Sequence, residues 1–145
     1  MSRNKNPDVQ KSMVAVAASG GQVGALVGTK VDATGYSRAH FIFNFGNGAA
    51  TTAALSAGIG PWQASTSGAT YAAIASASLA AVTSGVLSST SVTLEVDVPI
   101  SAGTPWLLVS GGSLLSTAVP HSCVVELYNG INRPPTASSI EVVTV

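Results

Sequence analysis

The stretch Ala39-His-Phe-Ile-Phe-Asn-Phe45 decides the fold class of this 145-residue chain. A phenylalanine occurs at every second position, so a β-strand would carry the three rings on one face and His40, Ile42 and Asn44 on the other. Three aromatic side chains in one row are typical of a strand that packs against a hydrophobic core. The segment is followed by Gly46-Asn-Gly48, a sequence typical of a turn.

The segment Ser91–Val98 shows the same alternation, with aliphatic residues at even positions and Thr93, Glu95 and Asp97 at odd ones. It predicts a second strand with Glu95 and Asp97 on its outer face. Other strands are predicted from shorter patterns bounded by Gly, Pro, Asn and Ser. Residues 13–27 are predicted to form two strands separated by a turn at Gly20-Gly21. The remaining predicted strands lie at 54–57, 62–65, 106–110, 122–128 and 140–145.

These short strands predict one all-β domain, an antiparallel β-sandwich or barrel of the jelly-roll type. Residues 1–12 are polar and are expected to form an extended N-terminal arm. The domain is expected to span residues 13–135, and residues 136–145 to form a C-terminal strand or tail that pairs with the body or with a neighbour. The secondary structure of residues 72–87 is not decided by the sequence. Their Ala content favours a helix, whereas their Ser, Thr and β-branched residues favour strands or ordered loop.

Between Arg38 and Glu95 the chain has 56 consecutive residues without a charged side chain. Charged residues make up 8% of the whole chain, compared with about a quarter in ordinary globular proteins. A surface with so little charge is poorly protected against association. We therefore expect much of it to be covered by copies of the same chain or by a larger partner, as in an assembly.

Composition argues against several other functions. Six basic residues and a net charge of +0 are too little for electrostatic capture of nucleic acid. The uncharged segment 72–87 is shorter than the roughly 20 residues of a membrane-spanning helix. His40 and His121 stand alone on separate predicted strands, so no metal or cofactor site is expected, and Cys123 is expected to be a small buried residue. Without a recognisable nucleophile, acid–base pair or phosphate loop, no enzymatic activity is expected.

Four stretches together resemble small structural proteins from the head gene clusters of tailed phages. Val31-Asp-Ala-Thr-Gly-Tyr-Ser-Arg-Ala-His-Phe41 resembles their first strand, and Trp62-Gln-Ala-Ser-Thr-Ser-Gly-Ala-Thr-Tyr-Ala-Ala-Ile74 resembles a segment with the same Gln, Ser, Gly and Ile spacing. Val96-Asp-Val98 and Pro105-Trp-Leu-Leu-Val109 are similar to two later strands. Val124-Val-Glu-Leu-Tyr128 followed by Arg133-Pro-Pro135 is similar to their final strand and exit.

The resemblance covers about residues 31–135 and implies a capsid decoration, or cement, protein. Such a protein would be a small β-domain on the outer surface of the virion head, binding the major capsid protein and its own copies, with a homotrimer favoured. The residues expected at these interfaces are Arg3, Lys5, Lys11, Trp62, Tyr71, Trp106 and Arg133. Two alternatives stay open. One is a tail, baseplate or head-fibre attachment component, and the other is a carbohydrate-binding β-sandwich in which Trp62, Tyr71 or Trp106 stacks on sugar rings.

Overall fold

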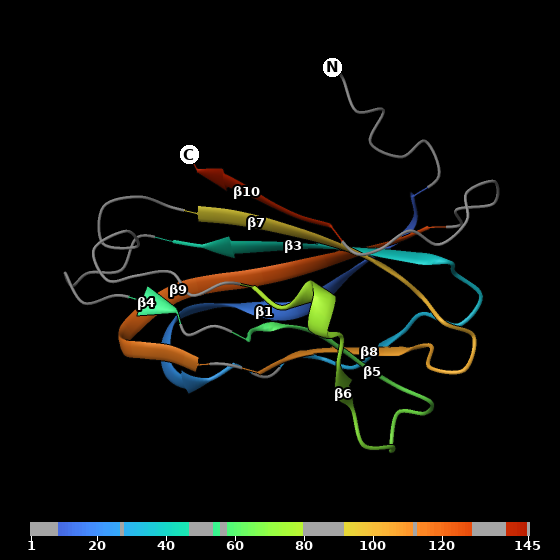
Figure 1. Ribbon diagram of the computed structural model, residues 1–145. Helices are drawn as coiled ribbons and strands as arrows, with labels where there is room; N and C mark the ends of the chain where they lie inside the picture. Colours follow the sequence, from blue (N-terminus) through green and yellow to red (C-terminus); the bar gives the residue numbers. More distant parts are fainter. Residues whose placement is uncertain are drawn as a thin grey trace.

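In the computed structural model, the described residues are 9–26, 28–46, 54–55, 58–79, 92–111, 113–128 and 139–144. They form two antiparallel β-sheets and one short 3₁₀ turn (Figure 1). Figure 1 shows the larger sheet in the upper part of the view and β5, β6 and β8 of the smaller sheet below it. The fold is therefore the all-β sandwich that the alternating stretches predicted.

The six-stranded sheet has the order β1-β9-β3-β7-β10, and β4 pairs with β9 beside this path. Its strands are β1 (Val9–Ala25), β3 (Arg38–Phe45), β4 (Ala54–Leu55), β7 (Val92–Pro99), β9 (Ser113–Tyr128) and β10 (Ser139–Thr144). The four-stranded sheet has the order β2-β8-β5-β6. Its strands are β2 (Val31–Asp32), β5 (Gly60–Ala64), β6 (Ala72–Ala73) and β8 (Trp106–Ser110), and the 3₁₀ turn η1 (Ala75–Ala77) follows β6.

The inner face of β3 lies in the hydrophobic core. Phe41, Phe43 and Phe45 are at most 1% exposed, and successive rings stack with centroids 6.3 Å apart. The two neighbouring strands add alternating buried side chains, and the smaller sheet contributes its own buried face. The alternation seen in the sequence is thus confirmed as burial. Other buried side chains of the core include Val31 of β2, Ile59 before β5, Val92, Leu94, Val96 and Val98 of β7, Val125 and Leu127 of β9, and Leu107 and Val109 of β8.

The segment between β1 and β2 joins the two sheets along one side. The Gly28 N–H donates to the carbonyl of Val109 on β8, and the Thr29 N–H donates to the carbonyl of Ala15 on β1, both at 2.7 Å. A Cβ atom at position 28 would collide with the Ala15 carbonyl oxygen. Because only glycine lacks this atom, Gly28 allows the connecting backbone to pass this close to β1.

Two predictions about single strands are wrong. The chain does not reverse at Gly20-Gly21, because both glycines lie inside β1, which pairs with β9 along its whole length. The register of this pair shifts between Ser19 and Gln22, so the flexible glycines accompany an irregularity of the strand. The strand predicted at 122–128 starts too late, since β9 begins at Ser113 and continues through Pro120.

Both ends of the domain contribute strands to the larger sheet. β1 begins at Val9, so residues 9–12 of the expected arm belong to the strand that pairs with β9, whereas residues 1–8 lie outside the described part. At the other end, β10 pairs with β7 of the same chain. The sequence did not decide the secondary structure of residues 72–87. Residues 72–79 contain β6 and η1 but no α-helix, and residues 80–87 lie outside the described part. No helix in the described ranges is long and apolar enough to span a bilayer.

Candidate functional site

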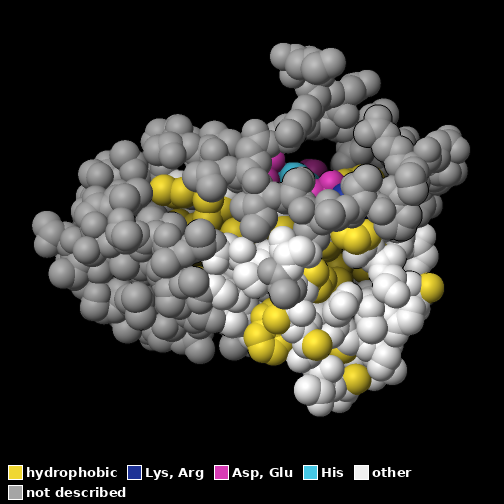
Figure 2. All heavy atoms as spheres, in the orientation of Figure 1, with side chains coloured by type: hydrophobic (Ala, Val, Ile, Leu, Met, Phe, Trp, Pro, Cys, Tyr) yellow, Lys and Arg dark blue, Asp and Glu magenta, His cyan; other side chains and the backbone are white. Residues whose placement is uncertain are grey.

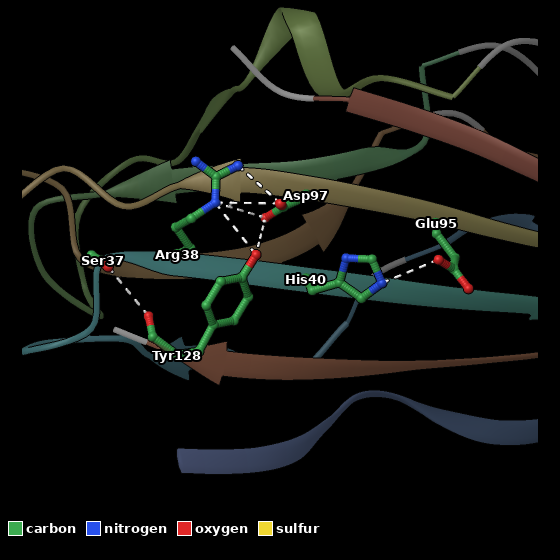
Figure 3. A network of polar contacts seen from close by, with 6 residues as sticks. All are labelled: Ser37, Arg38, His40, Glu95, Asp97 and Tyr128. Carbon is green, nitrogen blue, oxygen red and sulfur yellow. Dashed lines mark hydrogen bonds and ion pairs between the residues drawn. The ribbon is translucent and has the colours of Figure 1, made fainter. Parts of the chain in front are cut away.

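The outer face of the six-stranded sheet carries a polar network centred on Arg38. This residue is directly opposite Tyr128 of β9, and His40, two residues further along β3, is opposite Asp97 of β7. Directly opposite residues in antiparallel strands point to the same face. Figure 3 shows the Arg38 guanidinium, the Asp97 carboxylate and the Tyr128 hydroxyl pointing toward one another from three adjacent strands.

The distances define a compact set of charge-assisted contacts. Arg38 Nη2 lies 2.9 Å from Asp97 Oδ2, and Arg38 Nε lies 3.3 Å from each carboxylate oxygen. The Tyr128 hydroxyl donates to Asp97 Oδ1 at 2.8 Å and lies 3.3 Å from Arg38 Nε. Ser37 extends the network, because its N–H and its hydroxyl both donate to the Tyr128 carbonyl oxygen. One carboxylate is therefore held by a guanidinium and a phenol.

Arg38 is 9% exposed, and burial and hydrogen bonding have opposite effects on the pKa of its guanidinium. Burial by itself lowers the pKa of the guanidinium, but the hydrogen bonds with Asp97 and Tyr128 outweigh this effect, and the pKa is raised. The pKa of the Tyr128 phenol is also raised, chiefly by burial, so the hydroxyl keeps its proton and acts as a donor to Asp97 at neutral pH. The network holds strands in register and offers no activated nucleophile.

His40 has a carboxylate partner on β7. Its Nε2 atom lies 3.3 Å from Glu95 Oε2, and the side chain of Glu95 is only 12% exposed. His40 is also directly opposite Glu126 of β9. Glu95 and Asp97 lie on the outer face of β7, as the alternation predicted, and both carboxylates pair with side chains of β3. Among the side chains that the structure describes, no three metal-binding groups are arranged to hold an ion.

The outer face of the four-stranded sheet carries the two tryptophans. Trp62 of β5 is directly opposite Leu108 of β8, and Trp106 of β8 is directly opposite Ala64 of β5. Both tryptophans are partly exposed. On its other side, Trp106 is opposite Asp32 of β2. We call the surface formed by Trp62, Trp106 and Leu108, together with Tyr71, the aromatic face.

Tyr71 and Lys30 complete this surface. Lys30 precedes β2 and Tyr71 precedes β6, the two edge strands of the small sheet. Val31 is buried, so its neighbour Lys30 points to the opposite, outer side. Lys30 Nζ lies 5.8 Å from the centroid of the Tyr71 ring and donates to the Ser67 carbonyl oxygen at 2.6 Å. The contact brings side chains from both edges of the sheet together.

Two polar atoms of the aromatic face are buried without a hydrogen-bond partner in the described structure: Trp62 Nε1 and the Tyr71 hydroxyl. Burial raises the pKa of Tyr71. The Trp62 ring is held close to Gly111, where a Cβ atom would lie 3.2 Å from Nε1. An unmet buried donor costs about 1–3 kcal/mol, so two of them on one small face are unusual.

The structure places Trp62 and Trp106 on one face of the small sheet, with Tyr71 against Lys30. Their assignment to an interface stays a prediction. Lys11 is exposed on β1, and its charge helps to lower the pKa of Asp32, after the larger effect of the hydrogen bonds from Thr34. Arg3, Lys5 and Arg133 lie outside the described residues. Sequence reasoning missed the Arg38–Asp97–Tyr128 network, whose only signal was an arginine beside one predicted strand and an outward aspartate on another.

Comparisons with protein-family models, curated proteins and solved structures found no match to this chain.

Proposed function

We propose that this chain is a decoration protein of a tailed-phage head, which binds the outer capsid surface and stabilises the shell by bridging neighbouring capsomers. Its partners would be the major capsid protein and further copies of itself, with a homotrimer favoured. Two things support the proposal. One is the resemblance of four sequence stretches to such proteins, and the other is the neutral exterior of the described residues.

The neutral exterior is the observation that carries the proposal. Among the described residues that are exposed, the charged ones are Lys11, Lys30 and Asp32, and most of the others are Ser, Thr, Ala or Gly. The charged side chains visible in Figure 2 gather near the top of the view. Apart from undescribed atoms, the lower part, where Figure 1 places β5, β6 and β8, shows only hydrophobic and neutral polar side chains.

Such a surface suits permanent contacts between proteins. Covering it removes few charges from water, so little desolvation penalty opposes the burial of apolar area. Small side chains also permit close approach of two backbones. The cores of protein interfaces are likewise depleted of charged residues. In a shell, a decoration protein with contacts of this kind adds interfaces that must break before capsomers can separate.

The direct test mixes the purified full chain with empty phage shells. Light scattering should show the chain associated with itself and a gain in shell mass, and mass spectrometry should count copies in a fixed ratio to the major capsid protein. A few copies per particle would instead favour a tail, baseplate or head-fibre component. A chain that stays monomeric at high concentration and does not bind shells would refute the proposal.

The N-terminal arm can be tested separately. Deleting residues 1–8 leaves β1 intact, because this strand begins at Val9. We expect lower shell occupancy with unchanged thermal unfolding, since the arm would contact the capsid through Arg3 and Lys5. The double substitution Arg3→Ser and Lys5→Ser is the matched control, because it removes the charges and keeps the chain length. Unchanged occupancy in both variants would exclude the arm from capsid binding.

A further inference from the structure

We propose that the aromatic face binds a neutral saccharide, with a sugar ring stacked on the Trp106 indole and its hydroxyl groups bonded to Asp32 and Lys30. This inference goes beyond the virion role and does not depend on it. It rests on the side chains that the small sheet brings together, on the area of its face and on the hydrogen-bonding groups that the described structure leaves unmet.

Trp106 and Asp32 form the centre of the site. They are directly opposite each other on β8 and β2, so their Cβ atoms lie about 5 Å apart on one face. Asp32 Oδ1 accepts hydrogen bonds from the Thr34 N–H at 3.0 Å and the Thr34 hydroxyl at 2.6 Å. These bonds fix the carboxylate and leave Oδ2 without a partner among the described residues. An aromatic ring beside a fixed acceptor matches a sugar, which has an apolar C–H face and hydroxyl groups at its rim.

The charges of the face favour a neutral ligand. Lys30 and Asp32 have opposite charges, and the other members of the face, Trp62, Tyr71, Trp106 and Leu108, are uncharged at neutral pH. Lys30 Nζ uses one donor for the Ser67 carbonyl, which positions the ammonium group and leaves two protons for ligand oxygens. A strongly basic ligand would find only Asp32 as a compensating charge, and a strongly acidic one would meet this carboxylate beside Lys30 and Lys11. A neutral ligand instead uses Lys30 and Asp32 as hydrogen-bond partners.

The area of the face suits a small ligand. The four strands of the small sheet, in the order β2-β8-β5-β6, have two, five, five and two residues. With about 3.3 Å per residue and about 4.8 Å between strands, its face covers roughly 200 Å². A protein partner, which needs about 800 Å² on each side, would have to extend beyond this face. One or two sugar rings fit within it.

The tryptophans of the aromatic face are held by the strands of the small sheet, which lowers the entropic cost of binding. Trp62 and Trp106 are both carried by strands, and the Trp62 ring packs beside Gly111, where no side chain could fit. The unmet donors Trp62 Nε1 and Tyr71 Oη lie on the same face. Both atoms are buried, so they mark the polarity of the face, and the direct contacts to a ligand fall to Asp32 and Lys30.

The test uses the full chain without shells, so its failure is distinguishable from failure of the virion role. Tryptophan fluorescence is titrated with three neutral probes, maltohexaose, cellohexaose and chitohexaose, and with hyaluronan hexasaccharide as the acidic probe. At least one neutral probe should bind and should shift the indole N–H signals of Trp62 or Trp106 in ¹H–¹⁵N spectra. Failure of all neutral probes, binding of the acidic probe alone, or unchanged indole signals would overturn the inference.

Variants then locate the site. Trp106→Ala should weaken binding roughly tenfold or more, whereas Trp106→Phe should keep most of it, because an aromatic face remains. Asp32→Asn should weaken binding while leaving the sheet folded, since Asp32 is exposed. Val14→Ser is the matched control, because Val14 is an exposed apolar residue of β1, outside the aromatic face. Equal affinity of Trp106→Ala, Asp32→Asn and the native chain would place the ligand elsewhere and refute the site.

Discussion

Arg38 is the residue at which the charge of this chain matters most for its fold. A guanidinium that is 9% exposed must find partners, and both of its partners come from neighbouring strands of the same sheet. Asp97 and Tyr128 are themselves hydrogen-bonded, so the three groups satisfy one another. A shift of β3 by one residue would turn Arg38 toward the core and leave these partners unmatched. The network therefore favours one register over the others.

We predict that Arg38→Met destabilises the protein by about 2 kcal/mol, measured by urea unfolding. The substitution keeps the packing of the long side chain but leaves Asp97 without its cation. The value is below that of a fully buried ion pair, because the side chain of Asp97 is 23% exposed and water can partly solvate it.

Two further variants check this prediction. Lys11→Met, at an exposed position of β1, should change the free energy of unfolding by less than about 0.5 kcal/mol. Adding Asp97→Asn to Arg38→Met should recover part of the loss, because the orphaned carboxylate is then neutral. Equal stability of Arg38→Met and Lys11→Met would show that the network contributes nothing to the fold.

The buried thiol of Cys123 should make the stability of the fold depend on pH. The thiol is 1% exposed, and burial raises its pKa far above the usual value. In the unfolded chain the thiol loses its proton above about pH 8.5, whereas the folded chain keeps it. The unfolded state is therefore favoured as pH rises, and the free energy of unfolding should fall by up to about 1.4 kcal/mol per pH unit above that point.

The measurement is a series of urea unfolding curves between about pH 7.5 and about pH 9.5. Cys123→Ala should be less stable at neutral pH, because it leaves a small cavity, but its stability should lack this alkaline decline. Only the slopes with pH are compared, so the cavity does not affect the conclusion. Parallel slopes for the two proteins would contradict a thiol that stays protonated in the fold.

At the scale of elements, strands with one buried face were predictable and the irregular ones were not. β3, β7 and β8 were found from alternation or from a short apolar run, because burial on one side selects every second residue. β1 was wrongly divided at Gly20-Gly21. A local turn signal is weak against pairing with a strand as long as β9, and the sequence gives no sign of that partner.

The candidate sites were likewise predictable only in part. Trp62, Tyr71 and Trp106 could be selected by residue type. The common face of the two tryptophans follows from the pairing of β5 with β8, and Tyr71 is placed by its contact with Lys30. Arg38 and Asp97 are 59 positions apart, and the register between β3 and β7 brings them within hydrogen-bond distance. Residue type is local information, whereas register depends on the whole sheet.

Two glycines in turns offer a matched test of the loops that connect the elements. Gly35 has φ 86° and Gly111 has φ 81°, so both lie where L-residues are strained. A Cβ atom at Gly35 would meet nothing within 4 Å, whereas one at Gly111 would collide with the Gly58 carbonyl oxygen and lie 3.2 Å from Trp62 Nε1. The two positions share the backbone strain and differ in space.

We predict that Gly35→Ala costs about 1 kcal/mol and that Gly111→Ala costs about 2–4 kcal/mol in thermal or urea unfolding. The excess at Gly111 comes from the collision with backbone, which cannot move as a flexible side chain can. Gly111→Ala should also change the fluorescence of Trp62, and Gly35→Ala should not. Similar losses in both variants would mean that the turn at Gly111 has more room than the structure gives it.

For the whole molecule, the distribution of charge links the fold to the proposed role. Arg38, Asp97, His40 and Glu95 are paired on the outer face of the large sheet, so they contribute little free charge to the exterior. The exposed charges of the described residues are those of Lys11, Lys30 and Asp32. An association driven by such a surface must depend mainly on apolar burial, which responds to salt differently from ion pairing.

We therefore predict that shell occupancy changes less than about twofold between about 0.05 and about 0.5 M NaCl, where the Debye length falls from more than 10 Å to less than 5 Å. Ammonium sulfate should increase occupancy, because sulfate strengthens apolar burial. Any remaining decline with NaCl should vanish when residues 1–8 are deleted, since Arg3 and Lys5 are then absent. Sedimentation of shell mixtures measures all three effects. A steep loss with NaCl that persists in the deletion variant would mean that ion pairs of the β-sandwich, rather than its neutral exterior, hold the protein on its partner.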